Sequence, residues 1–236
     1  MITFEGRIGY RRKMTPKSLP ARANYHHGNL IEALLEAAIV LIEDKGVESL
    51  SVREVAKRAG VSPGAPFRHF SSKTALLTAV AEQAMSRLTE AVSAELQRAG
   101  DDDPIAALRA VGQGYLNWVL ANPTHFQVIS SRTLIDFHGS EKLVAENEAI
   151  RLIMVQLIDD ARRLGLLRDG ISSEDLIFSS RAFIYGVARM WIDGHFPEWR
   201  IERPAEAAMS AALDMFILSI GAQVGQISPP APERDR

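Results

Sequence analysis

The sequence predicts an all-α fold, with a small three-helix N-terminal domain followed by a larger helical domain. Apolar residues recur at the three- and four-residue spacing of amphipathic helices along most of the 236-residue chain. The segments with this spacing begin after Ser, Asn or Asp and end at Gly or Pro, the residues that cap and terminate helices. Hydrophobic residues make up 47% and charged residues 24% of the chain, a balance typical of globular proteins.

The formal net charge of −2 is unevenly distributed. Residues 1–75 hold 12 Lys and Arg against 7 Asp and Glu, a net charge of +5, and the rest of the chain carries −7. This asymmetry indicates that one end of the protein meets a polyanion, with ordinary charge scatter as the alternative. Disulfides and thiolate catalysis are excluded because there is no cysteine. Without a secretory leader or a membrane-spanning apolar run, a cytoplasmic location and no membrane association are expected.

Residues 1–27 form a basic N-terminal arm, in which six Lys or Arg residues accompany the single acid Glu5. Pro16 and Pro20 interrupt any helix there. Such an arm either contacts the grooves or phosphates of a nucleic acid or serves only as a solubilising tail. The next segment, residues 30–45, is predicted to be a helix that Asn29 caps and that ends at Gly46.

A second helix is expected after Ser51, because Ser51 and Glu54 have the spacing of a capping box. This helix ends at Gly60. Ser62 is a favourable N-cap and Pro63 suits the first helical position, so a third short helix is expected to start at Ser62. Two short helices joined by a Gly-containing turn form a helix-turn-helix, a motif that enzymes also contain.

The residues of this motif resemble the DNA-binding signature of the TetR/AcrR family of transcription regulators. From Ser51 to Lys73 they read SVREVAKRAGVSPGAPFRHFSSK, with the family's Ala-Gly-Val-Ser turn, aromatic residue, His-Phe pair and lysine. The resemblance covers about residues 29–80, and Tyr25 to Gly28 resemble the lead-in of one branch. It implies a helix-turn-helix domain over residues 28–88 and a ligand-binding and dimerisation domain over residues 89–225. The composition of residues 226–236 predicts a disordered tail.

The resemblance also implies which residues meet DNA. The start of the third helix would approach base edges in the major groove, and flanking residues would contact phosphates. Phe67 stands where the family usually has Tyr, so a phosphate contact through a hydroxyl is lost, and Pro66 replaces the usual Leu or Val. His69 is alternatively an ordinary surface histidine. The DNA-binding candidates are Arg53, Ser62, Pro63, Gly64, Ala65, Phe67, Arg68, His69 and Lys73.

The predicted reading edge is poor in hydrogen-bond donors. Pro63, Gly64 and Ala65 offer no side-chain donor, which excludes bidentate readout of guanine or adenine from these positions. Sequence preference then depends on Ser62, Arg68, contacts with thymine methyl groups, DNA shape or the arm. A lysine directly after a helix N-cap opposes the helix dipole, so the position of Lys73 indicates that it serves an anion.

Six further helices are predicted, over residues 74–99, 104–121, 123–135, 141–165, 173–195 and 204–224. The run of Asp at 101–103 is interpreted as helix capping rather than as a metal site. Aromatic and soft residues on these helices either form the core or line an apolar ligand pocket. The pocket candidates are Tyr115, Trp118, Phe126, Phe137, Met154, Phe178 and Phe183, with Arg132, Asp136, His138 and Arg181 as polar anchors or plain surface residues.

The last two helices are apolar on more than one face, so each must be covered on two sides. Together with the resemblance, this predicts a homodimer formed through these helices, with Ser179, Ser180, Gly186 and Ala188 allowing close approach.

The sequence as a whole predicts a transcription regulator, most simply a repressor that a small apolar ligand releases from double-stranded operator DNA. A regulator without a small-molecule effector is the alternative. An enzyme is the competing class, but the sequence has no nucleophile elbow, phosphate-binding loop or metal-ligand spacing. Neither a cofactor nor a metal is expected.

Overall fold

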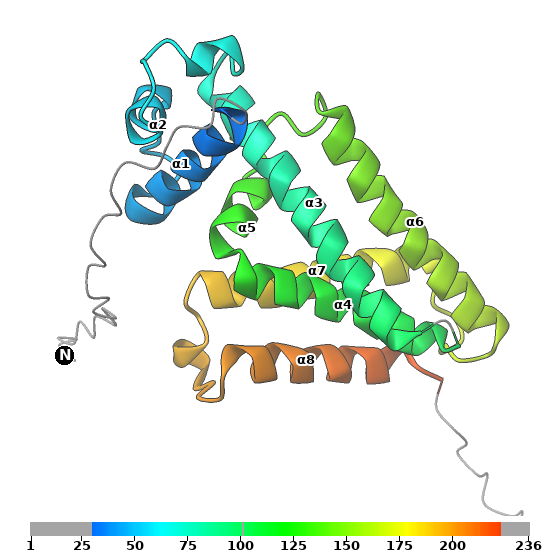
Figure 1. Cartoon of the computed structure of the whole chain (residues 1–236). Helices are drawn as coiled ribbons and strands as arrows, with labels where there is room; N and C mark the ends of the chain where they lie inside the picture. The colour runs from blue at the N-terminus through cyan, green and yellow to red at the C-terminus, as the bar shows by residue number, and fades with distance from the viewer. Residues whose placement is uncertain (1–29, 101, 223–236) are drawn as a thin grey trace, which may run out of the picture. The chain divides into compact units, whose positions relative to one another are not determined.

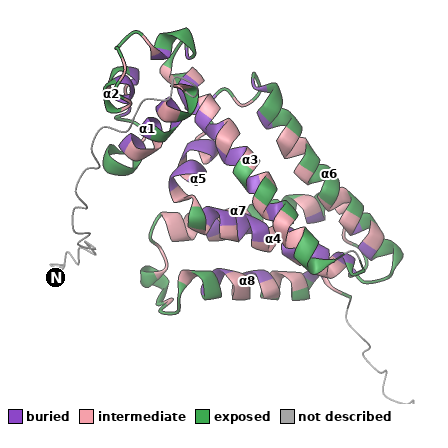
Figure 2. Ribbon diagram, in the orientation of Figure 1, coloured by how far each residue is buried: buried purple, intermediate pink, exposed green. Residues whose placement is uncertain are grey.

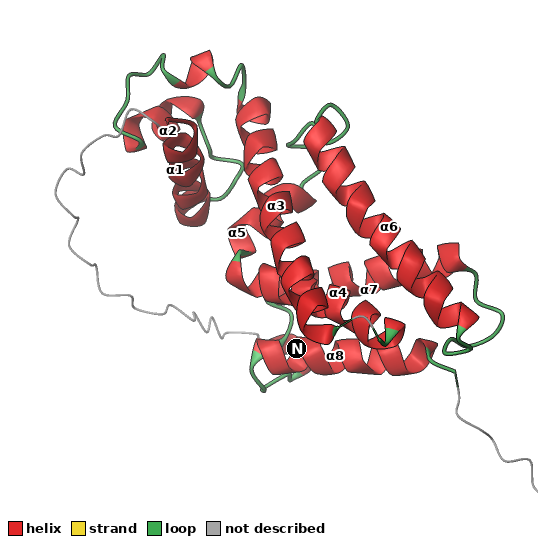
Figure 3. Ribbon diagram, turned by 45° about the vertical axis from the view of Figure 1, so that its right-hand side comes forward, coloured by secondary structure: helices red, strands yellow, loops and turns green. Residues whose placement is uncertain are grey.

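The computed structural model describes residues 30–100 and 102–222. The predicted arm and tail lie outside these residues. Apart from one isolated antiparallel bridge, between Leu167 and Gly221, the regular structure in the described part is helical (Figure 3). In chain order it consists of α1 (Leu30–Lys45), α2 (Val52–Arg58), the 3-10 turn η1 (Pro66–Arg68), α3 (Lys73–Ala99), α4 (Pro104–Ala121), α5 (Pro123–Ser130), α6 (Glu141–Arg163), α7 (Ser173–Ile192), the 3-10 turn η2 (Pro197–Trp199) and α8 (Ala205–Ile220) (Figure 1).

Ser51, Ser72 and Asp103 cap the helices that follow them, whereas the Glu54 carboxylate is bonded to Lys45 Nζ at 2.8 Å rather than to the Ser51 N–H of the predicted capping box. Ser51 Oγ accepts the N–H of Glu54 at 3.2 Å, and Ser72 Oγ accepts the N–H of Ala75 at 3.0 Å. The Asp103 carboxylate accepts two backbone N–H groups at the start of α4, at 2.8 and 3.2 Å, which makes it a helix cap. Among the described residues, no group of three side chains is arranged to hold a metal ion.

The third helix differs from the prediction. Residues 62–65 form a turn, and only the 3-10 turn η1 follows, starting at Pro66 instead of Ser62. The N–H of Ala65 bonds to Ser62 O at 2.9 Å, a three-residue spacing. Pro66 has no N–H for the four-residue bond back to Ser62, which would be the first backbone bond of an α-helix that starts at Ser62, so no α-helix begins there.

Helix α5 is also shorter than predicted, ending at Ser130 rather than at residue 135. The hydroxyls of Ser130 and Ser131 both donate to the carbonyl of Gln127, at 3.2 and 2.7 Å. These side-chain bonds compete with the backbone bonds that would continue the helix. The loop before α6 therefore begins earlier and contains Arg132 and Phe137.

The long helix α3 forms the centre of the described structure. It packs against α4, α5 and α6, and the buried residues concentrate on α3, α4 and α5 (Figure 2). At the crossing with α4 the two backbones come very close, because Gly114 has no side chain to separate them. The domain boundary predicted at residues 88 and 89 falls inside α3. None of the described helices combines the length and apolar character that a membrane crossing requires.

Candidate DNA-binding surface and ligand cavity

The candidate DNA-binding residues lie on the surface formed by α2, the turn after it and η1. Arg53, Ser62, Pro63, Gly64, Phe67, Arg68 and His69 are exposed, whereas Ala65 and Lys73 are half-buried. Phe67 is 51% exposed, so its ring is accessible for the apolar contact with DNA that the resemblance implies. Beneath this surface Val55, Pro66 and Phe70 are buried and hold the turn in place.

Basic side chains on this surface differ in their partners. Arg53 and Arg68 form no salt bridge with any described residue, so their charges are available to an anion. Lys45 pairs with Glu54 at 2.8 Å, and this lysine holds the pKa of the Glu54 carboxyl below its usual value. The acid of the predicted capping box is thus neutralised at the edge of the surface.

Lys73 has a structural contact that the sequence does not indicate. Its Nζ donates to the backbone carbonyl of Glu48 at 2.7 Å, which ties the start of α3 to the loop between α1 and α2. This contact gives the lysine a role in the DNA-free protein, in addition to the predicted phosphate contact. The two roles are compatible, because an ammonium group has three donors.

We expect Lys73→Ala to weaken binding to all DNA sequences about equally. Loss of one phosphate contact lowers the slope of log affinity against log salt concentration by roughly one unit. Loss of the bond to Glu48 lowers the free energy of unfolding by about 1 kcal/mol. Fluorescence anisotropy over a salt series measures the slope, and Lys142→Ala, a change of an exposed lysine on α6, is the control. A change in preference at a single base position would contradict the phosphate role.

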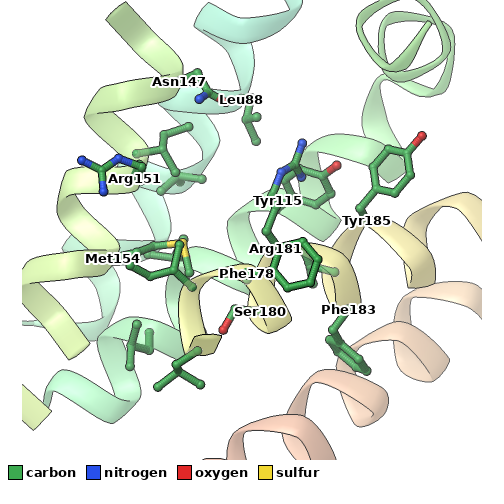
Figure 4. Close-up of a pocket in the computed structure, with 18 of the residues that line it drawn as sticks. Leu88, Tyr115, Asn147, Arg151, Met154, Phe178, Ser180, Arg181, Phe183 and Tyr185 are labelled. Carbon is green, nitrogen blue, oxygen red and sulfur yellow. The ribbon is translucent and has the colours of Figure 1, made fainter. Parts of the chain in front are cut away.

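A cavity of about 870 Å³ lies among α3, α4, α5, α6, α7 and α8 (Figure 4). Six of the seven predicted pocket residues line it, namely Tyr115, Trp118, Phe126, Met154, Phe178 and Phe183. Phe137 does not line it, and its ring lies 3.7 Å from the Arg132 guanidinium carbon. Of the polar anchors, Arg132 and Arg181 line the cavity, whereas Asp136 and His138 do not.

The aromatic residues of the cavity also form part of the core. Trp118 and Phe126 are almost completely buried, and the ring of Tyr115 lies 5.9 Å from that of Trp118 and 6.4 Å from that of Phe126. Phe178, in contrast, is 73% exposed. The two interpretations of these residues, core or pocket wall, therefore apply together.

Sequence reasoning missed several residues of the cavity wall. Met85, Leu88 and Val92 of α3 line it, and none of them was among the predicted pocket residues. Leu213 and Phe216 of α8 also contribute, although their helix was assigned to the dimer interface. A stripe of apolar residues signals burial, but it does not show whether the neighbouring space is filled.

Helix α5 lies between the cavity and the DNA-binding part. Thr124 Oγ1 donates to the Glu43 carboxylate of α1 at 3.1 Å, and His125 Nε2 lies 3.1 Å from Gln83 Oε1 of α3. Burial, and secondly the charge of Arg87, lowers the pKa of His125 to about 4, so this histidine is neutral at neutral pH. On its other side, the same short helix contributes Phe126 to the cavity wall.

The last two helices expose large apolar side chains. Met215 and Leu218 of α8 are 73% and 79% exposed, and Phe178 of α7 is similarly open. Gly186 adds an open position on α7, where a Cβ atom would meet nothing within 4 Å. Ala188 is completely buried within the protomer, which corrects its assignment to the interface.

Comparison with known proteins identifies matches over both parts of the chain. Residues 34–80 match the family model of bacterial regulatory proteins of the tetR family, and residues 108–216 match that of the tetracyclin repressor-like C-terminal domain. The HTH-type transcriptional regulator BetI of Yersinia pestis is 36% identical over 83 residues, which are 35% of this chain and 42% of BetI. The uncharacterized HTH-type regulator YvdT of Bacillus subtilis is 36% identical over 72 residues, or 30% of this chain and 36% of YvdT. The chain thus matches less than half the length of these curated relatives.

Solved structures share the fold over most of the chain. A protein of unknown function from Rhodococcus sp. RHA1 is 27% identical with a TM-score of 0.68, and the match covers 85% of this chain and all of that one. FadR from Bacillus subtilis, solved in complex with stearoyl-CoA, is 15% identical with a TM-score of 0.65, covering 80% of this chain and 98% of FadR. A putative tetR family regulator from Shewanella sp. PV-4 is 22% identical with a TM-score of 0.61, covering 82% and 98%.

Proposed function

This chain belongs to the TetR family of DNA-binding transcription regulators, and from that premise we propose that it is a repressor which a small, mainly apolar ligand releases from operator DNA. One observation carries the proposal: a single helix, α3, serves both sites. Its first residue, Lys73, ties down the loop between α1 and α2, and its residues Met85, Leu88 and Val92 line the cavity. A ligand that displaces α3 therefore also displaces the DNA-binding surface.

A second connection supports the coupling. Helix α5 contributes Phe126 to the cavity, and the neighbouring Thr124 is hydrogen-bonded to Glu43 of α1. Packed helices move as units, so a ligand that shifts α5 also pulls on α1. The volume of about 870 Å³ lies in the range typical of cavities for small molecules. FadR, which shares the fold, was solved in complex with stearoyl-CoA, so this fold can accommodate a ligand with a long apolar chain.

The proposed repressor is a homodimer formed through α7 and α8. The exposed Phe178, Met215 and Leu218 would be covered by the same residues of a second copy, as a two-fold interface requires. Two DNA-binding surfaces in one dimer match a pseudo-palindromic operator whose half-sites have the spacing of the two surfaces.

The release mechanism is tested by thermodynamic linkage. Once thermal-shift screening identifies a ligand, we expect it to lower operator affinity about 5- to 150-fold, which corresponds to the usual ~1–3 kcal/mol of coupling. By reciprocity, saturating operator DNA must lower ligand affinity by the same factor. Isothermal titration of the ligand into the dimer, with and without operator, measures the ligand affinity in the two states. Their ratio gives the coupling factor. Equal affinity in the two titrations would leave a regulator without this effector.

Two variants on α6 sharpen this experiment. Met154→Trp places an indole in the cavity, so we expect it to abolish ligand binding and leave operator affinity without ligand unchanged. Val144→Trp introduces the same side chain at a position that is 41% exposed and outside the cavity wall, so the response to ligand should persist. Loss of the response in both variants would locate the ligand elsewhere.

A further inference from the structure

Three arginines line the cavity, and their partners differ. Arg151 is neutralised by Glu148 through two hydrogen bonds of 2.8 and 2.6 Å. Arg132 and Arg181 form no salt bridge with any carboxylate in residues 30–100 and 102–222. The guanidinium of Arg132 lies over the ring of Phe137, and that of Arg181 over the rings of Tyr115 and Tyr185. Aromatic rings attract a cation but do not neutralise it. The cavity therefore contains two positive charges without counter-charges.

These two charges lie at the same end of the cavity. The Arg181 guanidinium carbon is 5.2 Å from the ring centre of Tyr115 and 5.7 Å from that of Tyr185, and Figure 4 shows the three side chains together. Arg132 lies near Arg181. Partial burial, and secondly the positive charge of Arg181, lowers the pKa of the Arg132 guanidinium. Both side chains are exposed at the mouth of the cavity, and two neighbouring positive charges there favour a ligand that carries an anion.

The carboxylate in the cavity wall does not provide that anion. Glu174 belongs to the first turn of α7 and precedes Arg181 by seven residues, which is about 10 Å along a helix. It forms no ion pair with either arginine among the described residues.

The cavity wall also contains a hydrogen-bond donor without an acceptor. The indole N–H of Trp118 is buried without any hydrogen-bond partner, although Trp118 lines the same cavity. Buried N–H groups of this kind are rare in proteins, because leaving one unpaired costs about 1–3 kcal/mol. Through the Tyr115 ring, Trp118 belongs to the same side-chain cluster as Arg181.

We propose that Arg132 and Arg181 bind the carboxylate of an amphiphilic organic acid, whose apolar body fills the rest of the cavity. The proposal rests on the proposed function, because it names the chemical class of the ligand for that cavity. A neutral ligand would leave both guanidinium groups without a counter-charge, and a cationic ligand would be repelled by them. Both arginines keep some access to solvent, so the carboxylate binds without complete loss of its hydration.

The test compares probes that share a decyl chain. Calorimetric titration of the full-length protein with decanoate and with decan-1-ol measures what the charge contributes. We expect decanoate to bind at least about 10-fold more tightly, as for a charge-assisted hydrogen bond. Equal affinities would overturn the carboxylate site but keep the cavity as a ligand site. If decyl phosphate binds tightly and neither of the other two probes does, the cavity takes a phosphate ester and the carboxylate site is overturned. If decanoate, decan-1-ol and decyl phosphate all fail to bind, both proposals fail.

Arginine variants locate the charge. Arg132→Gln should remove most of the preference for decanoate over decan-1-ol. Arg181→Gln should do the same, with sedimentation to confirm that this α7 variant still forms the same oligomer. Arg151→Gln is the matched control, because Glu148 already neutralises this arginine, and the preference should persist. An unchanged preference in Arg132→Gln, or a loss of preference in Arg151→Gln alone, would overturn the assignment.

Discussion

Replacing Leu218 by Asp is expected to convert the protein to a monomer and to lower operator affinity by at least about 100-fold. Leu218 is 79% exposed on α8, and Met215, one turn earlier, is 73% exposed. In a two-fold interface, each substitution buries two carboxylates, one from each protomer, and each carries a desolvation penalty of several kcal/mol. The loss in affinity follows because linking two DNA-binding surfaces raises affinity by about 10²–10⁴ over one surface.

Sedimentation velocity at micromolar concentration, together with fluorescence anisotropy on a palindromic operator, checks both effects. Leu152→Asp is the control, because Leu152 is a 52% exposed leucine on α6, which is not one of the two proposed interface helices. This variant should remain a dimer with normal operator affinity. A monomeric wild-type protein that binds operator, or a dimeric Leu218→Asp variant, would rule out the interface on α7 and α8.

The helices could be predicted from the sequence because their signals are local. Ser72 and Asp103 cap the starts of α3 and α4 as expected, and Gly46 and Gly60 end α1 and α2 with positive φ angles of 81° and 71°. Each of these residues acts on a backbone group within a few positions of itself. The effect of a capping residue therefore does not depend on contacts with distant parts of the chain.

The segment after α2 shows where local reasoning is insufficient. Ser62 and Pro63 are a good helix start when considered alone, but Pro66 removes the first backbone bond that this helix needs. A short helix has few bonds, so the loss of one decides between an α-helix and a 3-10 turn. The candidate reading residues 62–65 consequently lie on a turn.

The cavity could be predicted only in part, because it depends on contacts between distant segments. The aromatic composition indicated six of its residues, but composition does not distinguish a filled core from an open one. Phe137 lies outside the cavity wall, on the loop between α5 and α6, and composition alone does not show where a loop places a side chain. The bond between Lys73 and Glu48 joins residues 25 positions apart, and no local pattern signals it.

The close crossing of α3 and α4 is another feature without a local signal, and it leads to a strong prediction for stability. A Cβ atom at Gly114 would lie 2.7 Å from the Cα of Val92 and 2.9 Å from the carbonyl oxygen of Ala91. Both are backbone atoms of α3, so the clash can be relieved only by moving a helix. Overpacking of a core costs about 1–3 kcal/mol and more where backbone must move, which exceeds the ~1 kcal/mol that Ala gains over Gly in a helix.

We therefore expect Gly114→Ala to lower the free energy of unfolding by about 2 kcal/mol, measured by urea denaturation at a fixed protomer concentration. Gly112→Ala, two residues earlier on the same helix, is the matched control. Its Cβ would meet side-chain atoms of Leu213, at 2.7 Å from Cδ1 and 3.1 Å from Cδ2, and that flexible side chain borders the cavity and can move into it. We expect a change of less than about 1 kcal/mol for this control. Equal stability of the two variants would show that α3 yields easily at the crossing, and α3 would then be too compliant to carry a ligand signal from the cavity to Lys73.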